Sequence, residues 1–122
     1  SAIKIGDPAS WDRAVRVIRE TNGVVTSVTD EEILEAKAVV DSSGVGCEPA
    51  SAASVAGVRQ LRERGVIGER ERVVAVLTGH VLKDPEAVAE YHMLGSRTGV
   101  RVNRPVEIGA TVAEVERVLR QS

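Results

Sequence analysis

The strongest constraint on the fold is the segment from Arg72 to Leu77, whose five-residue apolar run over 73–77 stops abruptly at Thr78-Gly79-His80. The run is apolar at successive positions, which is typical of a parallel strand covered by helices on both faces. A polar Thr-Gly-His sequence directly after such a strand indicates either an ordinary turn or a hydroxyl that is presented to a ligand. The sequence leaves both alternatives open at this point.

Helical and extended patterns alternate along the chain before this run. Capping, glycine and hydrophobic-spacing signals predict helices over 8–22, 29–40 and 49–64, and strands over 24–28, 45–48 and 72–77. This alternation predicts an α/β fold, a layered parallel sheet with flanking helices. Beyond it, the patterns predict a helix over 85–94, an extended segment over 99–108 and a last helix that Thr111 caps. We expect two parts, a main domain over 1–92 and a tail over 93–122.

Composition limits the classes of protein that this chain can represent. Hydrophobic residues make up 43% of the 122 residues, and Trp11 and Tyr91 are the only aromatic ones, so the core must consist of aliphatic side chains. The net charge of −2, with both signs interspersed, gives no reason to expect a nucleic-acid or membrane partner. The single cysteine, Cys47, fits a reducing compartment and predicts a cytoplasmic protein.

The first candidate site is Glu48, which follows the short predicted strand and precedes Pro49 and a helix start. Ligands in open α/β sheets bind beyond the carboxyl ends of strands, so a carboxylate here is a candidate binding group. A glutamate before a helix is more commonly a cap for the free backbone amides. Both interpretations remain possible from the residues alone.

The second candidate site is Thr78 with Gly79 and His80. The Thr78 hydroxyl can donate or accept a hydrogen bond, and Gly79 permits unusual backbone angles or a close approach. The alternative is a turn threonine that bonds its own backbone. His80 could act as an acid or a base, although a histidine beside a glycine turn is more often structural.

Other reactive side chains give weaker signals. Cys47 lacks metal-ligand spacing and is expected to be a small buried residue, and His92 is expected on a solvated helix face. Lys37 is expected among charges and Lys83 in an exposed turn, so neither is predicted to lie in an apolar pocket. The chain shows neither a phosphate loop nor paired cysteines, and no metal site is predicted.

Three stretches together resemble threonine synthases, which are pyridoxal-phosphate (PLP) enzymes of fold type II. They are A-I-K-I-G-D-P over 2–8 followed by Trp11, G-C-E-P-A-S-A-A-S over 46–54, and V-L-T-G-H with L-K-D-P over 76–85. The intervening T-D-E-E-I-L-E-A-K over 29–37 also fits. Their order and spacing match the carboxyl-terminal part of that enzyme over about residues 2–86. The resemblance therefore implies part of the large domain of a fold type II enzyme, and a chain that is a carboxyl-terminal fragment.

The resemblance implies roles for three residues in binding PLP. In this family the threonine of the L-T-G-H stretch meets the pyridine nitrogen of the cofactor, and Thr78 is the match, with Gly79 beside it. Glu48 matches a glutamate near the face of the cofactor ring. The Schiff-base lysine and the phosphate-binding loop lie upstream in the family, so no catalytic residue is assigned here. Val81 and Asp7 depart from the family, which usually has Gly and Asn there.

The implied activity is that of the parent enzyme, a PLP-dependent lyase that converts O-phospho-L-homoserine and water to L-threonine and phosphate. The fragment alone is expected to be inactive and not to hold the cofactor, and the complete enzyme is expected to be a homodimer with a small-molecule substrate. Two alternatives remain. They are another fold type II lyase, such as a threonine dehydratase, and a non-catalytic α/β binding module.

Overall fold

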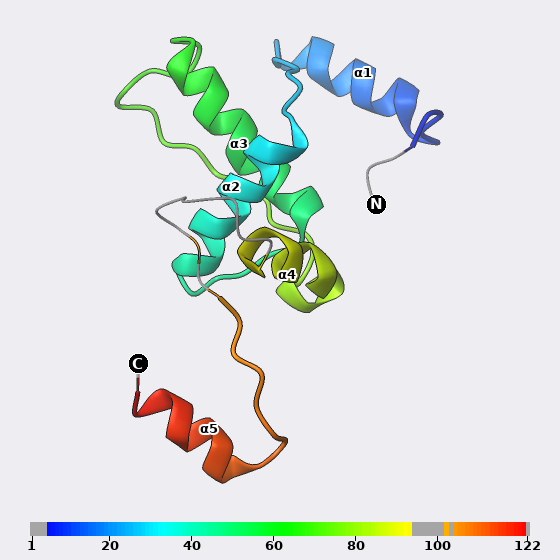
Figure 1. The fold of residues 1–122 in the computed structure, drawn as a ribbon. Coiled ribbons are helices and arrows are strands. Elements are labelled where there is room, and N and C mark those ends of the chain that lie inside the picture. The colour runs from blue at the N-terminus through cyan, green and yellow to red at the C-terminus, as the bar shows by residue number, and fades with distance from the viewer. Residues whose placement is uncertain (1–4, 94–101, 103, 122) are drawn as a thin grey trace.

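The computed structural model describes residues 5–93, 102 and 104–121 (Figure 1). Five α-helices and one short 3-10 helix are present in the described residues. They are α1 (Trp11–Glu20), α2 (Asp30–Ser42), α3 (Pro49–Glu63), η1 (Val81–Lys83), α4 (Pro85–Met93) and α5 (Val112–Leu119). Each of the five predicted helices is therefore confirmed, although α1 is shorter than the predicted 8–22.

The helix boundaries follow the local signals in the sequence. Thr29 and Glu32 form a reciprocal capping box that begins α2, with the Thr29 hydroxyl accepting from the Glu32 amide at 3.2 Å. Pro49 occupies the first turn of α3, where its missing N–H costs no hydrogen bond. Gly65 follows that helix with φ of 73°, a left-handed conformation that glycine adopts without strain.

The hydrophobic core lies where α2 packs against α3. Its buried members are Ile33, Ala36, Val40, Cys47, Ala52 and Ala56, and Val28, Ala53, Val55 and Leu77 pack against them. Small alanines on α3 let the two helices approach closely, so a core without phenylalanine can still exclude water. In Figure 1 these two helices cross at the centre of the molecule, with α4 beside one end of α2.

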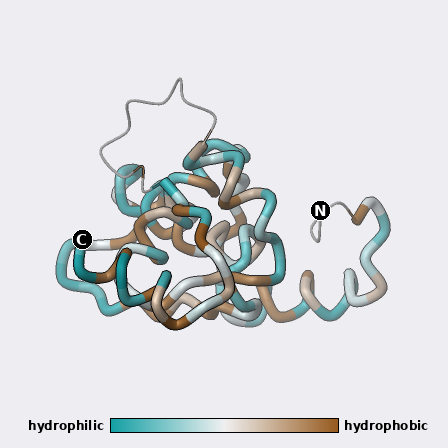
Figure 2. The backbone as a smooth tube through the Cα atoms, turned by 60° about the horizontal axis from the view of Figure 1, so that its bottom comes forward, coloured by the Kyte–Doolittle hydropathy of each residue, from teal (hydrophilic) through white to brown (hydrophobic). Residues whose placement is uncertain are grey.

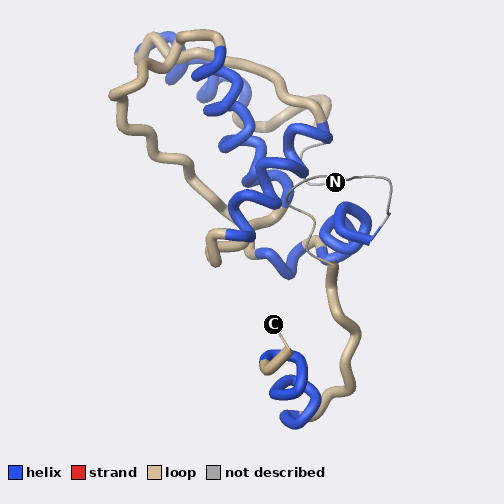
Figure 3. Tube along the Cα trace, turned by 60° about the vertical axis from the view of Figure 1, so that its left-hand side comes forward, coloured by secondary structure: helices blue, strands red, loops and turns tan. Residues whose placement is uncertain are grey.

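The predicted strands are the main disagreement with the structure. Figure 3 shows helices joined by loops, and the segments 24–28, 45–48 and 72–77 are loops within the described residues, which contain no strand. A helix closes its hydrogen bonds within one segment, whereas a strand needs a second strand alongside. The predicted extended segment over 99–108 lies partly outside the described residues, and its described positions from 104 to 108 are also in a loop.

Much apolar surface stays uncovered outside the core. Val73, Val74 and Val76 are exposed, and neither α1 nor α5 contains a buried residue. Figure 2 shows hydrophobic stretches in the connecting segments as well as in the helices, and α5 lies away from the other helices in Figure 1. Within the described part of the chain, none of the helices has the length and apolar character needed to cross a membrane.

Candidate functional site

The two polar clusters that the sequence singled out meet at one place in the structure. The amide of Glu48 donates to the carbonyl oxygen of Gly79 at 3.0 Å, which joins the residue before α3 to the end of the 72–77 segment. The Thr78 hydroxyl lies 3.5 Å from Glu48 Oε1, a long contact for two oxygens. Thr78 is exposed as a residue, and its hydroxyl lies among partly buried neighbours.

Ser51 links the two clusters, and the sequence analysis did not single it out as a site residue. Its Oγ accepts from the amide of Thr78 at 2.9 Å and from the amide of Gly79 at 3.1 Å, and lies 3.2 Å from Thr78 Oγ1. Ser51 is itself buried in the first turn of α3. The signal available in advance was its position three residues after Glu48, which places it at the same end of the helix.

Glu48 is buried at 5% exposure and does not cap α3 with its side chain. It occupies the capping position by its backbone alone, so the capping interpretation of its carboxylate is wrong. The carboxylate instead forms an ion pair with Lys83, at 2.8 Å between Nζ and Oε2. Lys83 is 59% exposed, as predicted for that turn, and brings a positive charge to a buried acid.

Gly79 is needed here for space rather than for an unusual backbone angle. Its φ is outside the left-handed region, which Gly44, Gly46 and Gly65 occupy among the described glycines. A Cβ at Gly79 would overlap the Glu48 side chain at its carboxyl carbon. The glycine therefore permits the close approach, one of its two expected roles, and any larger residue would displace Glu48.

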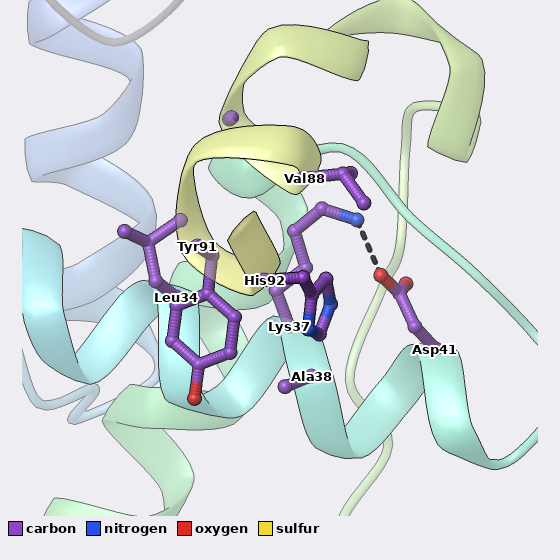
Figure 4. Close-up of a pocket in the computed structure, with 8 residues that line it drawn as sticks. Leu34, Lys37, Ala38, Asp41, Val88, Tyr91 and His92 are labelled. Carbon is purple, nitrogen blue, oxygen red and sulfur yellow. Dashed lines mark hydrogen bonds and ion pairs between the residues drawn. The ribbon is translucent and has the colours of Figure 1, made fainter. Parts of the chain in front are cut away.

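A buried lysine fixes the segment before Glu48, contrary to the sequence prediction for Lys37. Lys37 is 3% exposed, and its Nζ donates to Asp41 Oδ2 at 2.6 Å and to the Cys47 carbonyl oxygen at 2.7 Å (Figure 4). Asp41 Oδ1 accepts from the Cys47 amide at 3.2 Å. Two side chains of α2 thus hold both backbone groups of Cys47, which positions Glu48 next along the chain.

The aromatic residues of α4 cover this lysine. Leu34, Lys37, Ala38 and Asp41 of α2 line a pocket with Ala87, Val88, Tyr91 and His92 of α4. Figure 4 shows the His92 ring close to Lys37, and the Tyr91 and His92 rings meet edge to face at 4.9 Å. His92 is buried, so the prediction of a solvated position is wrong, because helical spacing alone did not show that α4 packs on α2.

The two remaining reactive side chains have structural roles. His80 precedes η1, and its Nδ1 accepts from the Leu82 amide at 3.1 Å, as in the structural alternative. Cys47 is fully buried, and burial raises the pKa of its thiol, so it is a poorly reactive core residue as expected. Among the described residues, no three acidic, histidine or cysteine side chains gather in a way that could hold a metal ion.

Known proteins match the chain over this same region. The protein from Methanosarcina acetivorans named threonine synthase is 54% identical over 91 residues, which are 74% of this chain and 22% of that protein. Threonine synthase from Synechocystis is 50% identical over 91 residues, 74% of this chain and 23% of that protein. Threonine synthase 2, chloroplastic, from Arabidopsis thaliana is 37% identical over 123 residues, 99% of this chain and 24% of that protein.

The chain spans about a quarter of the length of the curated relatives that it matches. Residues 1–79 match the family described as pyridoxal-phosphate dependent enzyme. That match covers more than half of the chain and includes Glu48, Ser51, Thr78 and Gly79. The chain therefore belongs to the pyridoxal-phosphate dependent enzyme family.

Proposed function

We propose that this chain forms the carboxyl-terminal part of a threonine synthase, which converts O-phospho-L-homoserine and water to L-threonine and phosphate. The observation that carries the proposal is the convergence of Thr78, Glu48 and Gly79 at one place. The similarity to proteins named threonine synthase supports it. The lysine that would hold the cofactor covalently is then supplied by residues outside this sequence, and the chain alone is inactive.

The residues at this place fit the chemistry of PLP, which when bound acts as an electron sink for carbanions. Thr78 carries a neutral hydroxyl that can donate to the pyridine nitrogen without protonating it. An aspartate would keep the nitrogen protonated, so the hydroxyl tempers the electron-withdrawing power of the ring. Glu48 lies beside Thr78, and the missing Cβ of Gly79 leaves the space that the Glu48 side chain needs.

The layered sheet belongs to the same proposal. The Glu48 amide bonds to the Gly79 carbonyl oxygen, just beyond segment 72–77, and this contact supports the proposal that segments 45–48 and 72–77 become neighbouring parallel strands in the complete enzyme. On this proposal, residues 1–92 belong to the catalytic domain and 93–122 form a tail that contains α5. On this proposal the complete enzyme is a homodimer, as the resemblance implies, and it is cytoplasmic with no nucleic-acid or membrane partner, as the single cysteine and the interspersed charges predict.

The test is Thr78→Val in the complete enzyme, measured as phosphate release from O-phospho-L-homoserine. We expect the variant to retain PLP absorbance and to lose turnover about tenfold or more, because the ring nitrogen loses its donor. The matched control is Thr21→Val, whose hydroxyl bonds only to carbonyl oxygens of α1 in the described structure. Unchanged turnover in Thr78→Val would remove the assigned role, and ammonia release from L-threonine would identify a dehydratase instead.

A further inference from the structure

We infer that Ser51 is a positioning residue that makes the Thr78 hydroxyl a hydrogen-bond donor. The inference rests on the proposed function, in which Thr78 meets the cofactor nitrogen, and it assigns to Ser51 a role that acts through Thr78. Ser51 and Thr78 stand 27 positions apart in sequence, and their hydroxyl oxygens lie 3.2 Å apart.

The direction of this contact follows from counting protons and lone pairs. A serine hydroxyl carries one proton and two lone pairs. The amides of Thr78 at 2.9 Å and Gly79 at 3.1 Å occupy both lone pairs of Ser51 Oγ. The contact with Thr78 Oγ1 must then use the proton of Ser51, so Ser51 donates and Thr78 accepts.

The opposite direction would leave buried polarity unsatisfied. If Thr78 donated, Ser51 Oγ would have to accept three hydrogen bonds, and its own proton would need another acceptor. Ser51 is 3% exposed, so water is not at hand, and no other acceptor for its hydroxyl is present in the part of the chain described. A buried donor without a partner is strongly disfavoured.

The proton of Thr78 is therefore directed away from Ser51 and remains available. Its neighbour in the structure is Glu48 Oε1 at 3.5 Å, beyond the usual range for two oxygens. Lys83 meanwhile holds the other oxygen of that carboxylate at 2.8 Å. A ring nitrogen placed before Thr78 would accept this proton without competition from a short hydrogen bond.

The experiment compares Ser51→Ala with Thr78→Val in the complete enzyme loaded with PLP that carries ¹⁵N in its pyridine ring. We expect Ser51→Ala to move the nitrogen resonance in the same direction as Thr78→Val and to raise the PLP dissociation constant about three- to tenfold. Ser54→Ala is the matched control, because Ser54 lies on the same helix and its hydroxyl donates to the Ser51 carbonyl oxygen. We expect its resonance to match the wild type.

A double variant separates positioning from general damage to the fold. If Ser51 acts through Thr78, Ser51→Ala combined with Thr78→Val should move the resonance no further than Thr78→Val alone. Ser51→Cys keeps a side chain of similar size with a weaker hydrogen-bonding group, so it should fall between wild type and Ser51→Ala. If Ser51→Ala does not fold, the nitrogen resonance of Ser51→Cys is measured in its place.

The outcomes distinguish this inference from the proposed function. A wild-type resonance in both Ser51→Ala and Ser51→Cys, together with a shift in Thr78→Val, would overturn the role of Ser51 and leave the proposed function standing. A wild-type resonance in Thr78→Val would overturn both. A shift in the double variant equal to the sum of the single shifts would also overturn the inference, because the two residues would then act independently.

Discussion

The unit formed by α2 and α3 and the segment 72–77 both contain many aliphatic residues, but the structure buries those of the helices and leaves the valines of the segment exposed. The helices bury Ile33, Ala36 and Ala52 against each other, whereas Val74 is 89% exposed. Both regions contain aliphatic residues at high density. The difference is that two helices can complete a small core between them, whereas a strand needs hydrogen-bonding neighbours on its edges as well as cover on its faces.

The difference separates two kinds of apolar surface. The surface between α2 and α3 is buried by this chain itself, whereas the valines of segment 72–77 are left for other residues to cover. A run of exposed valines is a poor surface for an isolated protein. Such a run is expected in a parallel strand of a larger sheet, which is buried on both faces. The site lies at the boundary between the two regions, because Ser51 belongs to α3 and Thr78 follows the segment whose valines are exposed.

The largest expected effect on stability comes from removing the buried Lys37 side chain of α2. Lys37→Ala leaves Asp41 and the Cys47 carbonyl without their buried partner, and we expect a loss of about 3 kcal/mol in the free energy of unfolding. Urea denaturation followed by circular dichroism measures it. Arg59→Ala is the control, because Arg59 forms ion pairs on the exposed face between α2 and α3 and should matter far less. Equal losses would contradict the distinction between buried and exposed pairs.

The second prediction tests the exposed valines of segment 72–77 with the substitution Val74→Thr. On this chain alone we expect a change below about 0.5 kcal/mol, because the side chain is exposed. In the complete enzyme we expect a loss of about 1–3 kcal/mol, because the added hydroxyl would be buried between sheet and helices. Thermal or urea denaturation of both proteins gives the comparison. A small change in both would mean that the segment is not a covered strand.

Local signals in the sequence predicted the helices because their causes are local. Thr29 and Glu32 are close in sequence, and so are Pro49 and the helix that it begins. The proximity of Glu48 and Thr78 could also be predicted, because both were expected at carboxyl ends of strands. The burial of Lys37 and His92 could not be predicted from the sequence. It depends on α4 packing across α2, and no spacing within either helix encodes that contact.

A smaller effect should separate the caps of α2 and α5. Thr29→Ala removes the hydroxyl that accepts from the Glu32 amide, which is the side-chain half of a reciprocal capping box, and we expect a loss of about 1 kcal/mol. Thr111→Ala removes a single bond to the Glu114 amide from a helix without buried residues, so it should lower only the helix content of that segment. Denaturation and hydrogen exchange measure the two effects. A larger global loss from Thr111→Ala would show that α5 is packed more firmly than its exposure indicates.

The smallest expected effect is the pH dependence of the α2 cap. The Thr29 amide donates to the Glu32 carboxylate at 2.7 Å, and this bond, followed by the bond from the Thr29 hydroxyl, lowers the pKa of Glu32 below its ordinary value. Because the folded chain then binds a proton less readily than the unfolded chain, the cap contributes stability above the ordinary glutamate pKa. The contribution is lost as the pH falls through the lowered value. Stability measured over this acidic window should therefore fall more in the wild type than in Glu32→Gln, whose amide does not titrate, and parallel curves would show that Glu32 does not control the cap.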